Sequence, residues 1–514
     1  MKKNKKEARK RYDATVELGE RIFSRALTAA VIAVVIMVNV LVYMLNAYTN
    51  ALYITPSEKE IPPISGATDS LFEEAFVKGA KVEISFCMAE DDLKLHDTGS
   101  LVYKTAKEYE ARYPELISLN YINVITQRDK DGHSVAEDFK KYTDAGITIN
   151  STSVIFECED RYRVLTDDRS GTGFIDFYTI NSSGSILAYD GELVMAGMIA
   201  GVIRTEYKKA YLTIGHTEQV DPSFARLVEL AGYRYDTVDL SDVPVPDDCD
   251  LLIISAPRND FDSSGADSSI NHALTEIGRL EAYLRSGGSL YVALDPYVKS
   301  LPNLEGLLSS LGIALADTEI DGNVIRDIVR DYGHSVTNDG YAIITEHADG
   351  ELATRIGETV SRYTDGDVIT RYAGALELSG SAEALLVSSS GAVCEDSGFV
   401  TDREGSYPIA AYNRLTLTGG EREATVYVHS SIYLTVSSAL VTNGYSNRDY
   451  TLAVFDELFG QDNLPYGCAT VLTDDQTLEN LTMNTATLYT VLMLALPVGL
   501  LGYGTVTIVR RKNR

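Results

Sequence analysis

The chain has 514 residues, 45% hydrophobic and 23% charged, with 32 Tyr, 13 Phe and no Trp. This composition predicts a folded protein of about three structural units, and a mean hydropathy of −0.06 excludes a polytopic permease. Residues 1–25 hold nine Lys/Arg against four acidic residues, and residues 510–514 hold four basic residues. Because these ends contribute +5 and +4 to a net charge of −29, the rest carries −38. So acidic a surface excludes nucleic-acid binding.

Two uncharged apolar segments adjoin the basic ends. Segments 26–48 and 487–509 are each long enough to cross a bilayer as a helix, which takes about 20 residues. A cleaved signal peptide is the alternative for the first segment, but its apolar run is too long for one. Basic flanks stay in the cytoplasm, so residues 1–25 and 510–514 are expected to be cytoplasmic tails. The sequence thus predicts a two-pass protein of the cell membrane with a large extracellular domain.

After a proline-containing linker at 49–80, residues 81–205 are expected to form an α/β unit. The order of the elements, strand, helix, strand, hairpin and helix, is that of a thioredoxin-like fold. Asp97 is positioned to cap the first helix, and apolar side chains follow it at helical spacing. The elements are predicted at 81–86, 97–113, 116–125, 153–165 and 192–204.

The redox chemistry of thioredoxins is missing from this unit. Cys87 follows the first strand without a second cysteine, and no proline precedes the strand at Ser153. The five cysteines are scattered, with neither a CxxC pair nor zinc-ligand spacing, so we interpret them as small buried hydrophobic residues. The unit is therefore expected to be a scaffold or a binding surface.

Residues 206–470 are expected to form a Rossmann-like or flavodoxin-like doubly wound domain, followed by a linker at 471–486. Strands alternate with helices, and the apolar run DLLIIS is typical of a buried parallel strand. Asp221-Pro222 and Gly232 mark the two ends of the first helix. A β-rich insertion is predicted at about 319–420. The expected strands are 209–214, 233–240, 250–255, 289–294 and 425–429, and the helices 222–230, 270–285, 304–311 and 448–459.

Several catalytic motifs are absent from the sequence. It contains no Walker A sequence, no G-x-G-x-x-G after a strand, no G-x-S-x-G and no H-E-x-x-H. We therefore predict neither a cofactor nor a metal.

One constellation of polar residues remains. In open α/β sheets, ligands bind beyond the carboxyl ends of the strands. If the strands are neighbours, the polar residues at their ends converge on one crevice. This crevice has three interpretations: helix caps and strand-end structure, a site for a polar ligand or partner loop, or a hydrolytic site with His216 as the base. The residues are His216, Glu218, Ser255, Asp295 and His429.

Four segments carry a family resemblance: YLTIGHTEQ, CDLLIISAPRNDF, LRSGGSLYVALDPYVKSLPNLEGLLSSLGIAL and VYVHSSIYLTVSSAL with its sequel NRDYTLAVFDELFG. With the apolar first segment and the thioredoxin-like unit, they resemble the GldG-like auxiliary components of ABC transport systems, which are known from gliding motility in some bacteria. The likeness covers nearly the whole chain, and Gly287 to Pro296 is its most specific part. The matching motif positions are Gly215, His216, Glu218 and Asp295-Pro296. The resemblance implies an extracytoplasmic Rossmann-like domain beside a separate permease and a separate ATPase.

The leading hypothesis is a non-enzymatic auxiliary subunit of an ABC transporter, whose partners are the permease and ATPase subunits. The alternative is a membrane-tethered hydrolase or carbohydrate-active enzyme that uses the strand-end crevice. An extracellular sensor is the third, but residues 1–25 and 510–514 are too short for a signalling domain. An ATPase gene and a permease gene beside this one would favour the first hypothesis.

Overall fold

The computed structural model describes residues 61–472 apart from short internal gaps, together with Phe23 and Arg510. The described ranges are 61–127, 139–166, 173–180, 184–263, 272–298, 300–320, 323–396, 399–420, 422–441 and 444–472. They belong to one compact unit, Ile61–Leu478. Within these ranges the protein is mixed α/β, with a four-stranded and a nine-stranded sheet as its two largest.

The prediction of two flanking transmembrane helices needs correction. No helix within the described ranges is long and apolar enough to cross a bilayer. The longest, α4 (Gly99–Arg112), has 14 residues and rises about 21 Å, short of the ~30 Å of a hydrocarbon core. This finding contradicts that part of the predicted fold class and the two-pass localisation. The segments concerned, 26–48 and 487–509, lie outside the described residues.

The first sheet has the strand order β2-β1-β3-β4. Strand β1 pairs in parallel with β2 and antiparallel with β3, which continues into β4 through a turn at Glu159, where φ is +56°. The expected hairpin is therefore present. The strands are β1 (Val82–Phe86), β2 (Ile117–Tyr121), β3 (Val154–Cys158) and β4 (Arg161–Leu165), and the helices α2 (Ala67–Lys78), α3 (Glu90–Leu95), α4, α5 (Lys140–Asp144) and α6 (Gly191–Ile203).

The predicted cap of α4 is wrong in detail. The helix begins at Gly99 rather than at Asp97, and the imidazole Nδ1 of His96 accepts the Gly99 N–H at 3.1 Å. The imidazole of His96, two residues before the N-cap position, thus accepts a free N–H of the first helical turn, as the carboxylate of Asp97 was expected to do.

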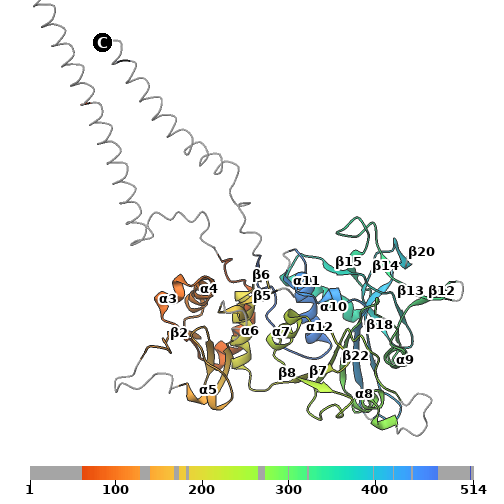
Figure 1. Cartoon of the computed structure of the whole chain (residues 1–514), viewed down its shortest axis with the longest axis horizontal. Coiled ribbons are helices and arrows are strands. Elements are labelled where there is room, and N and C mark those ends of the chain that lie inside the picture. The colour runs from red at the N-terminus through yellow and green to blue at the C-terminus, as the bar shows by residue number, and fades with distance from the viewer. Residues whose placement is uncertain are drawn as a thin grey trace, which may run out of the picture. The chain divides into compact units, whose positions relative to one another are not determined.

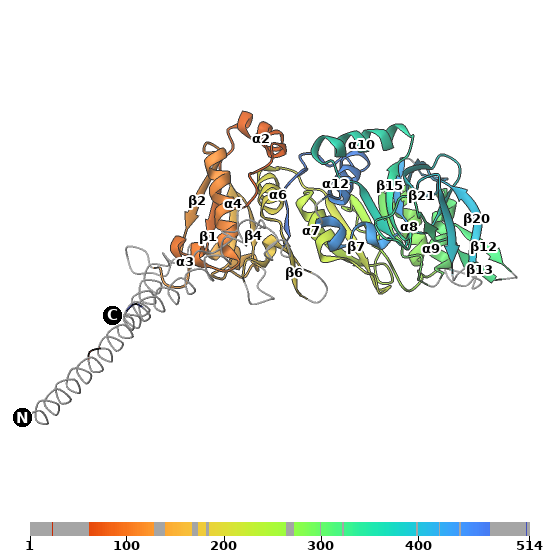
Figure 2. The same ribbon diagram turned by 90° about the horizontal axis from the view of Figure 1, so that it is seen from above.

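Helix α6 is the central packing element of the first part of the fold, the residues before β7; the second part is built around the nine-stranded sheet. Its residues are buried from Gly191 to Val202, so it is apolar on every side rather than amphipathic. It contacts β3, β4, α2 and α4, and also α7 of the second part (Figures 1 and 2). Gly197 makes the close approach to α7 possible, because a Cβ there would lie 2.7 Å from a methyl group of Leu230. One helix therefore joins the two parts through their apolar cores.

The nine-stranded sheet has the order β16-β15-β18-β21-β22-β10-β9-β7-β8. Five of its strands, β8, β7, β9, β10 and β22, are parallel. Counted from the β8 edge, they are the second, first, third, fourth and fifth of the five along the chain, which is the order of flavodoxin-like sheets. The switch point lies between β7 and β9. These strands are β7 (Lys209–Ile214), β8 (Arg234–Asp239), β9 (Leu251–Ser255), β10 (Ser289–Ala293) and β22 (Ala424–His429).

Side chains of the parallel strands alternate between two cores. Leu251 and Ile253 face the core that contains α7 and α12, whereas Leu252 and Ile254 face the core that contains α8 and α9. Asp221 caps α7 by accepting the Ser223 N–H at 2.8 Å, with Pro222 in the first turn, as predicted. The helices are α7 (Pro222–Leu230), α8 (Glu276–Arg285), α9 (Pro302–Ser310), α11 (Ser437–Val441) and α12 (Asn447–Glu457).

The segment predicted as a β-rich insertion continues the large sheet. Its antiparallel strands extend the sheet beyond β22, and it also contains the helix α10 (Glu351–Tyr363), which the sequence analysis did not predict. The strands of the large sheet here are β15 (Ala342–His347), β16 (Val368–Arg371), β18 (Glu383–Val387) and β21 (Pro408–Leu415).

Shorter sheets and turns complete the described fold. They comprise β5 (Tyr178–Ile180), β6 (Ile186–Tyr189) and β23 (Val471–Leu472); β11 (Ile313–Leu315) with β17 (Leu376–Leu378); β12 (Asp317–Ile320) with β13 (Asn323–Arg326); β14 (Val329–Arg330), β19 (Ala392–Asp396) and β20 (Phe399–Gly405); and the 3-10 turns η2 (Ile175–Phe177), η3 (His272–Leu274) and η4 (Ile432–Leu434).

Cys87 supplies a prediction about the first part. Its side chain lies in a small apolar core with Val124, Phe139 and Ile155, and burial raises the pKa of the thiol to about 12. We expect iodoacetamide to leave Cys87 unmodified in the native protein, because almost no thiolate forms there. Cys87→Ser should lower the free energy of unfolding by about 1 kcal/mol. Modification of Cys87 at the rate of the urea-unfolded chain, measured by peptide mass spectrometry, would contradict this.

Candidate functional site

His216 lies at the switch point of the parallel sheet, directly after β7. The turn that carries it has positive φ on both sides, +111° at Gly215 and +57° at Thr217. The imidazole side chain is 7% exposed and its ring stacks on Phe261, with the ring centroids 3.9 Å apart. Its Nδ1 lies 3.3 Å from Glu218 Oε1, and its Nε2 lies 3.1 Å from Glu276 Oε2. Both ring nitrogens therefore face carboxylates.

This arrangement sets the charge on His216. Burial by itself would lower the pKa of the imidazole, but the hydrogen bonds to Glu218 and Glu276 outweigh burial and raise that pKa. Burial by itself would raise the pKa of Glu218, but hydrogen bonds from the His216 ring and backbone lower that pKa overall. The raised pKa of His216 and the lowered pKa of Glu218 both favour a protonated imidazole beside a carboxylate. A general base must present a free nitrogen to its substrate, and His216 has none to offer because both of its ring nitrogens face carboxylates.

Ser255 ends β9 beside this turn and joins it to the neighbouring strand. Its hydroxyl donates to the Gln219 carbonyl at 2.7 Å, and the Gln219 N–H donates to the Ser255 carbonyl at 2.9 Å. The next residue, Ala256, has a φ of +44°. The Arg258 N–H donates back to the His216 carbonyl at 2.8 Å. The loops after β7 and β9 are thus tied together at the point where a flavodoxin-like sheet usually opens toward a ligand.

His429 ends β22 and is fully buried. Its Nδ1 donates to the Ser431 carbonyl at 2.8 Å, and its Nε2 lies 3.2 Å from the Tyr291 hydroxyl. Burial lowers the pKa of His429 to about 4, so the ring is neutral at physiological pH. His429 is therefore a satisfied core residue.

Asp295 follows β10 and has a partly exposed side chain. Its Oδ1 accepts the Tyr297 N–H at 3.0 Å, and its carbonyl accepts the Val298 N–H at 3.0 Å, which shapes the turn. The sheet places all the predicted residues at one edge, as expected, because β7, β9, β10 and β22 are parallel. The other four side chains are buried, however, and only His216 and Glu218 among them contact each other.

Glu276, the second carboxylate on His216, was missed in the sequence. It is the first residue of α8, after the capping residue Thr275, and its Oε2 also accepts the Asp262 N–H at 2.5 Å. It lies 60 residues beyond His216. A capping threonine followed by an acidic residue marks a helix start, but the pairing with His216 depends on the fold.

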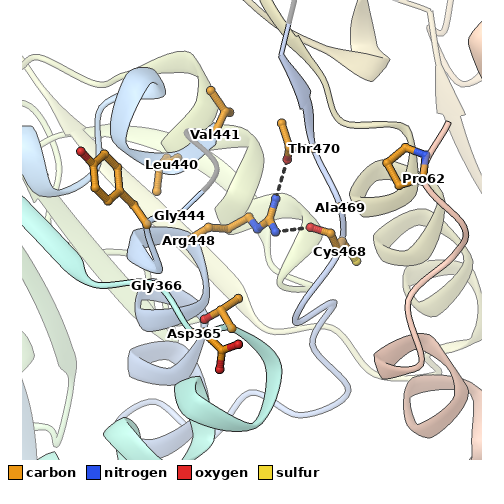
Figure 3. Close-up of a pocket in the computed structure, with 12 residues that line it drawn as sticks. Pro62, Asp365, Gly366, Leu440, Val441, Gly444, Arg448, Cys468, Ala469 and Thr470 are labelled. Atoms are coloured by element: carbon orange, nitrogen blue, oxygen red, sulfur yellow. Dashed lines mark hydrogen bonds between the residues drawn. The ribbon is translucent and has the colours of Figure 1, made fainter. Parts of the chain in front are cut away.

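A second region, also missed, surrounds Arg448 on α12. A pocket of about 500 Å³ opens beside it. Figure 3 shows the guanidinium directed at the chain segment before β23. Its Nη1 donates to the Thr470 hydroxyl at 2.9 Å and its Nη2 donates to the Cys468 carbonyl. Thr470 in turn donates to Asp190 at 2.7 Å, at the start of α6. Arg448 thus ties the end of the described chain to both parts of the fold.

Glu192 on α6 strengthens the same junction. One oxygen accepts the Ser65 N–H and the other accepts the Ala469 N–H, each at 2.7 Å. A single buried carboxylate therefore holds the segment before α2 against the segment before β23. For Arg448, burial lowers the pKa, but the charges of Asp449, Asp190 and Glu192 raise it overall. With its guanidinium committed to these neighbours, we assign Arg448 a structural role.

Within the described ranges, no group of three or more His, Cys, Asp or Glu side chains is arranged to hold a metal ion.

Comparison with known proteins identifies no family for this chain. No family model matches the chain, and no curated protein matches it. Among solved structures it is similar to the IFT52 N-terminal domain (16% identity, 48% of this chain and 96% of that one, TM-score 0.35). It is also similar to a cytoplasmic protein from Salmonella typhimurium (10%, 49% and 98%, 0.30) and a ThuA-like protein from Bacteroides uniformis (13%, 49% and 91%, 0.27). These TM-scores carry no argument about function.

The His216 cluster predicts a pH dependence of stability. The folded pKa of His216 is raised above 6.5, so its contribution is complete below pH 6.5 and is lost as pH rises through the folded value. The folded pKa of Glu218 is lowered below 4.5, so its contribution is present above pH 4.5 and is lost on acidification. Urea unfolding should show this cluster stabilising most between these limits. His216→Gln should flatten the loss above pH 6.5, and an unchanged pH profile in that variant would refute the assignment.

Glu192 predicts a local loss of stability. Glu192→Gln keeps one carbonyl oxygen but places an NH₂ group against a backbone N–H, which should lower the free energy of unfolding by about 1–3 kcal/mol. Hydrogen exchange should accelerate at Ala469. Glu206→Gln, at an exposed position after α6, is the matched control and should change neither quantity. Equal behaviour of the two variants would show that the junction does not depend on Glu192.

Proposed function

We propose that this chain is a non-enzymatic auxiliary subunit of an ABC transport system, acting with a separate permease and a separate ATPase. The observation that carries the proposal is the state of His216, whose two ring nitrogens face Glu218 and Glu276 at 3.3 and 3.1 Å. The segment from Gly287 to Pro296, the most specific part of the family resemblance, contributes β10 and the turn at Asp295 to the same edge.

The alternative, a hydrolase or carbohydrate-active enzyme, requires a base at this edge. His216 is buried with both ring nitrogens facing carboxylates, and His429 is buried with its Nδ1 bound to the Ser431 carbonyl. Ser255 donates its hydroxyl to a backbone carbonyl and so has no base to activate it. These side chains hold the loops in place, which suits a rigid surface for recognition better than a catalytic centre.

The partners can be tested directly. The full chain, tagged at its natural locus, should be purified from detergent extracts of its own cells, and the proteins bound to it identified by mass spectrometry. We expect a permease and an ATPase of one transport system in stoichiometric amounts. Recovery of the chain with neither of them, under conditions that keep other ABC complexes intact, would contradict the proposal.

Catalysis can be tested on the same protein. We expect no turnover of ester, glycoside or phosphoester panels by the parent chain. Asp295→Asn should leave the melting temperature nearly unchanged, because the amide oxygen still accepts the Tyr297 N–H, yet weaken complex formation by about 1–3 kcal/mol if Asp295 contacts the partner. A substrate turned over by the parent and lost in His216→Gln, at equal folded fraction, would favour the enzyme.

A further inference from the structure

A cluster of tyrosines and arginines lies beside Asp295 at the carboxyl edge of the sheet. Tyr372 is its centre: its ring centroid lies 5.4 Å from that of Tyr297, 5.1 Å from that of Tyr341 and 5.6 Å from that of Tyr433. Tyr297 follows β10 and Tyr433 follows β22, so both come from the ends of parallel strands. The full cluster, here the tyrosine–arginine surface, comprises Tyr297, Tyr332, Tyr341, Tyr372, Tyr433, Arg330 and Arg371.

The two arginines join these rings into one continuous surface. Arg330 lies over the rings of Tyr341 and Tyr332, at 4.3 and 4.8 Å from their centroids. Arg371 lies over the ring of Tyr372 at 4.6 Å. Each contact restrains a long side chain before any partner arrives, which reduces the entropy lost on binding.

The tyrosine–arginine surface is unusually exposed for aromatic side chains. Tyr297, Tyr332 and Tyr433 are 55%, 59% and 40% exposed, and the side chain of Arg371 is 44% exposed. Among the described residues, the hydroxyls of Tyr332, Tyr372 and Tyr433 have no hydrogen-bond partner. Tyrosine and arginine are also the residues enriched at the energetic centres of protein interfaces.

The backbone at Tyr372 is strained to present this surface. Its φ is +53°, in the left-handed region that bulky side chains rarely adopt. The strained residue is held by two bonds: its N–H donates to the Tyr341 carbonyl at 3.1 Å, and Ser431 donates to the Arg371 carbonyl at 2.5 Å. Strain of this kind persists where surrounding structure enforces it and concentrates at functional positions.

The chemistry of the surface indicates what it binds. The rings around Tyr372 are inclined to it by 81°, 47° and 65°, so they do not form the flat platform on which a sugar ring would stack. Arg371 and the tyrosine hydroxyls instead offer hydrogen-bond donors, and a guanidinium matches a carboxylate in shape and charge. Arg371 Nη2 lies 3.5 Å from Asp339 Oδ2, beyond the usual length of an N–H···O hydrogen bond, so its donors can still bind a carboxylate from a partner.

We infer that the tyrosine–arginine surface docks a loop of a partner protein, with an Asp or Glu carboxylate on Arg371 and apolar side chains against the exposed rings of Tyr433 and Tyr332. This inference does not depend on the transport partners, because it rests on the composition, exposure and geometry of the surface.

The test uses the full chain and a phage library of random short peptides. We expect selection of peptides that carry Asp or Glu next to apolar residues. Fluorescence anisotropy with a selected peptide should show binding weakened at least about tenfold by Tyr433→Ala and by Arg371→Gln. Tyr235→Ala removes an equally exposed tyrosine on β8 and should leave binding unchanged. Circular dichroism and the melting temperature establish that each variant is folded.

Charge reversal distinguishes contact from a structural effect. Arg371→Glu should reject the acidic peptide and bind the same peptide with its acid replaced by Lys, which a merely structural role of Arg371 cannot produce. The inference is overturned if no acidic peptide is selected, or if selected peptides bind the Tyr433→Ala and Arg371→Gln variants as tightly as the parent. Binding to a glycan array that requires Tyr433, without peptide selection, would assign the surface to carbohydrate instead.

Discussion

The contact of His216 with the carboxylates of Glu218 and Glu276 is the interaction on which the carboxyl edge of the sheet depends. It joins the turn after β7 to the start of α8 and encloses the histidine against Phe261. A buried charge is costly unless oppositely charged groups surround it, and two carboxylates meet that requirement here. Removing either would leave a charge without its partner, so the three side chains act as a unit. The edge where flavodoxin-like proteins open to ligands is thereby closed at its switch point.

The side chains that stay exposed at this edge lie away from the switch point, toward β10 and β22. There Asp295 stays partly exposed, and Tyr297 and Tyr433 extend the strand ends into an aromatic surface. The antiparallel strands beyond β22 and the strand β14 contribute the rest, because Tyr341 precedes β15, Tyr372 follows β16 and Arg330 ends β14. The insertion therefore builds the exposed surface together with the turns after β10 and β22.

Much of the fold could be predicted from local pattern. The apolar run at 250–255 became β9, buried on both faces, and Asp221-Pro222 capped α7 as expected. Helix α10 was missed although Leu352, Ile356 and Val360 recur at helical spacing, because Gly- and Ser-rich neighbours suggested short strands. The cap of α4 failed because an imidazole at His96 replaced the expected Asp97. The predicted membrane helices found no counterpart among the described helices, the longest of which is α4.

By itself, the sequence determined the acidic character of the chain, the alternation of strands with helices and the set of residues at the strand ends, since each depends on residues that are close along the chain. Only the tertiary structure decided what those residues do. Glu276 reaches His216 from 60 residues away, and Glu192 bonds Ser65 and Ala469 from opposite ends of the described fold. Whether a histidine is a base or a buried cation depends on such partners, because charge and burial set its pKa. No local sequence pattern shows which carboxylate, distant along the chain, will contact a given histidine in the folded protein.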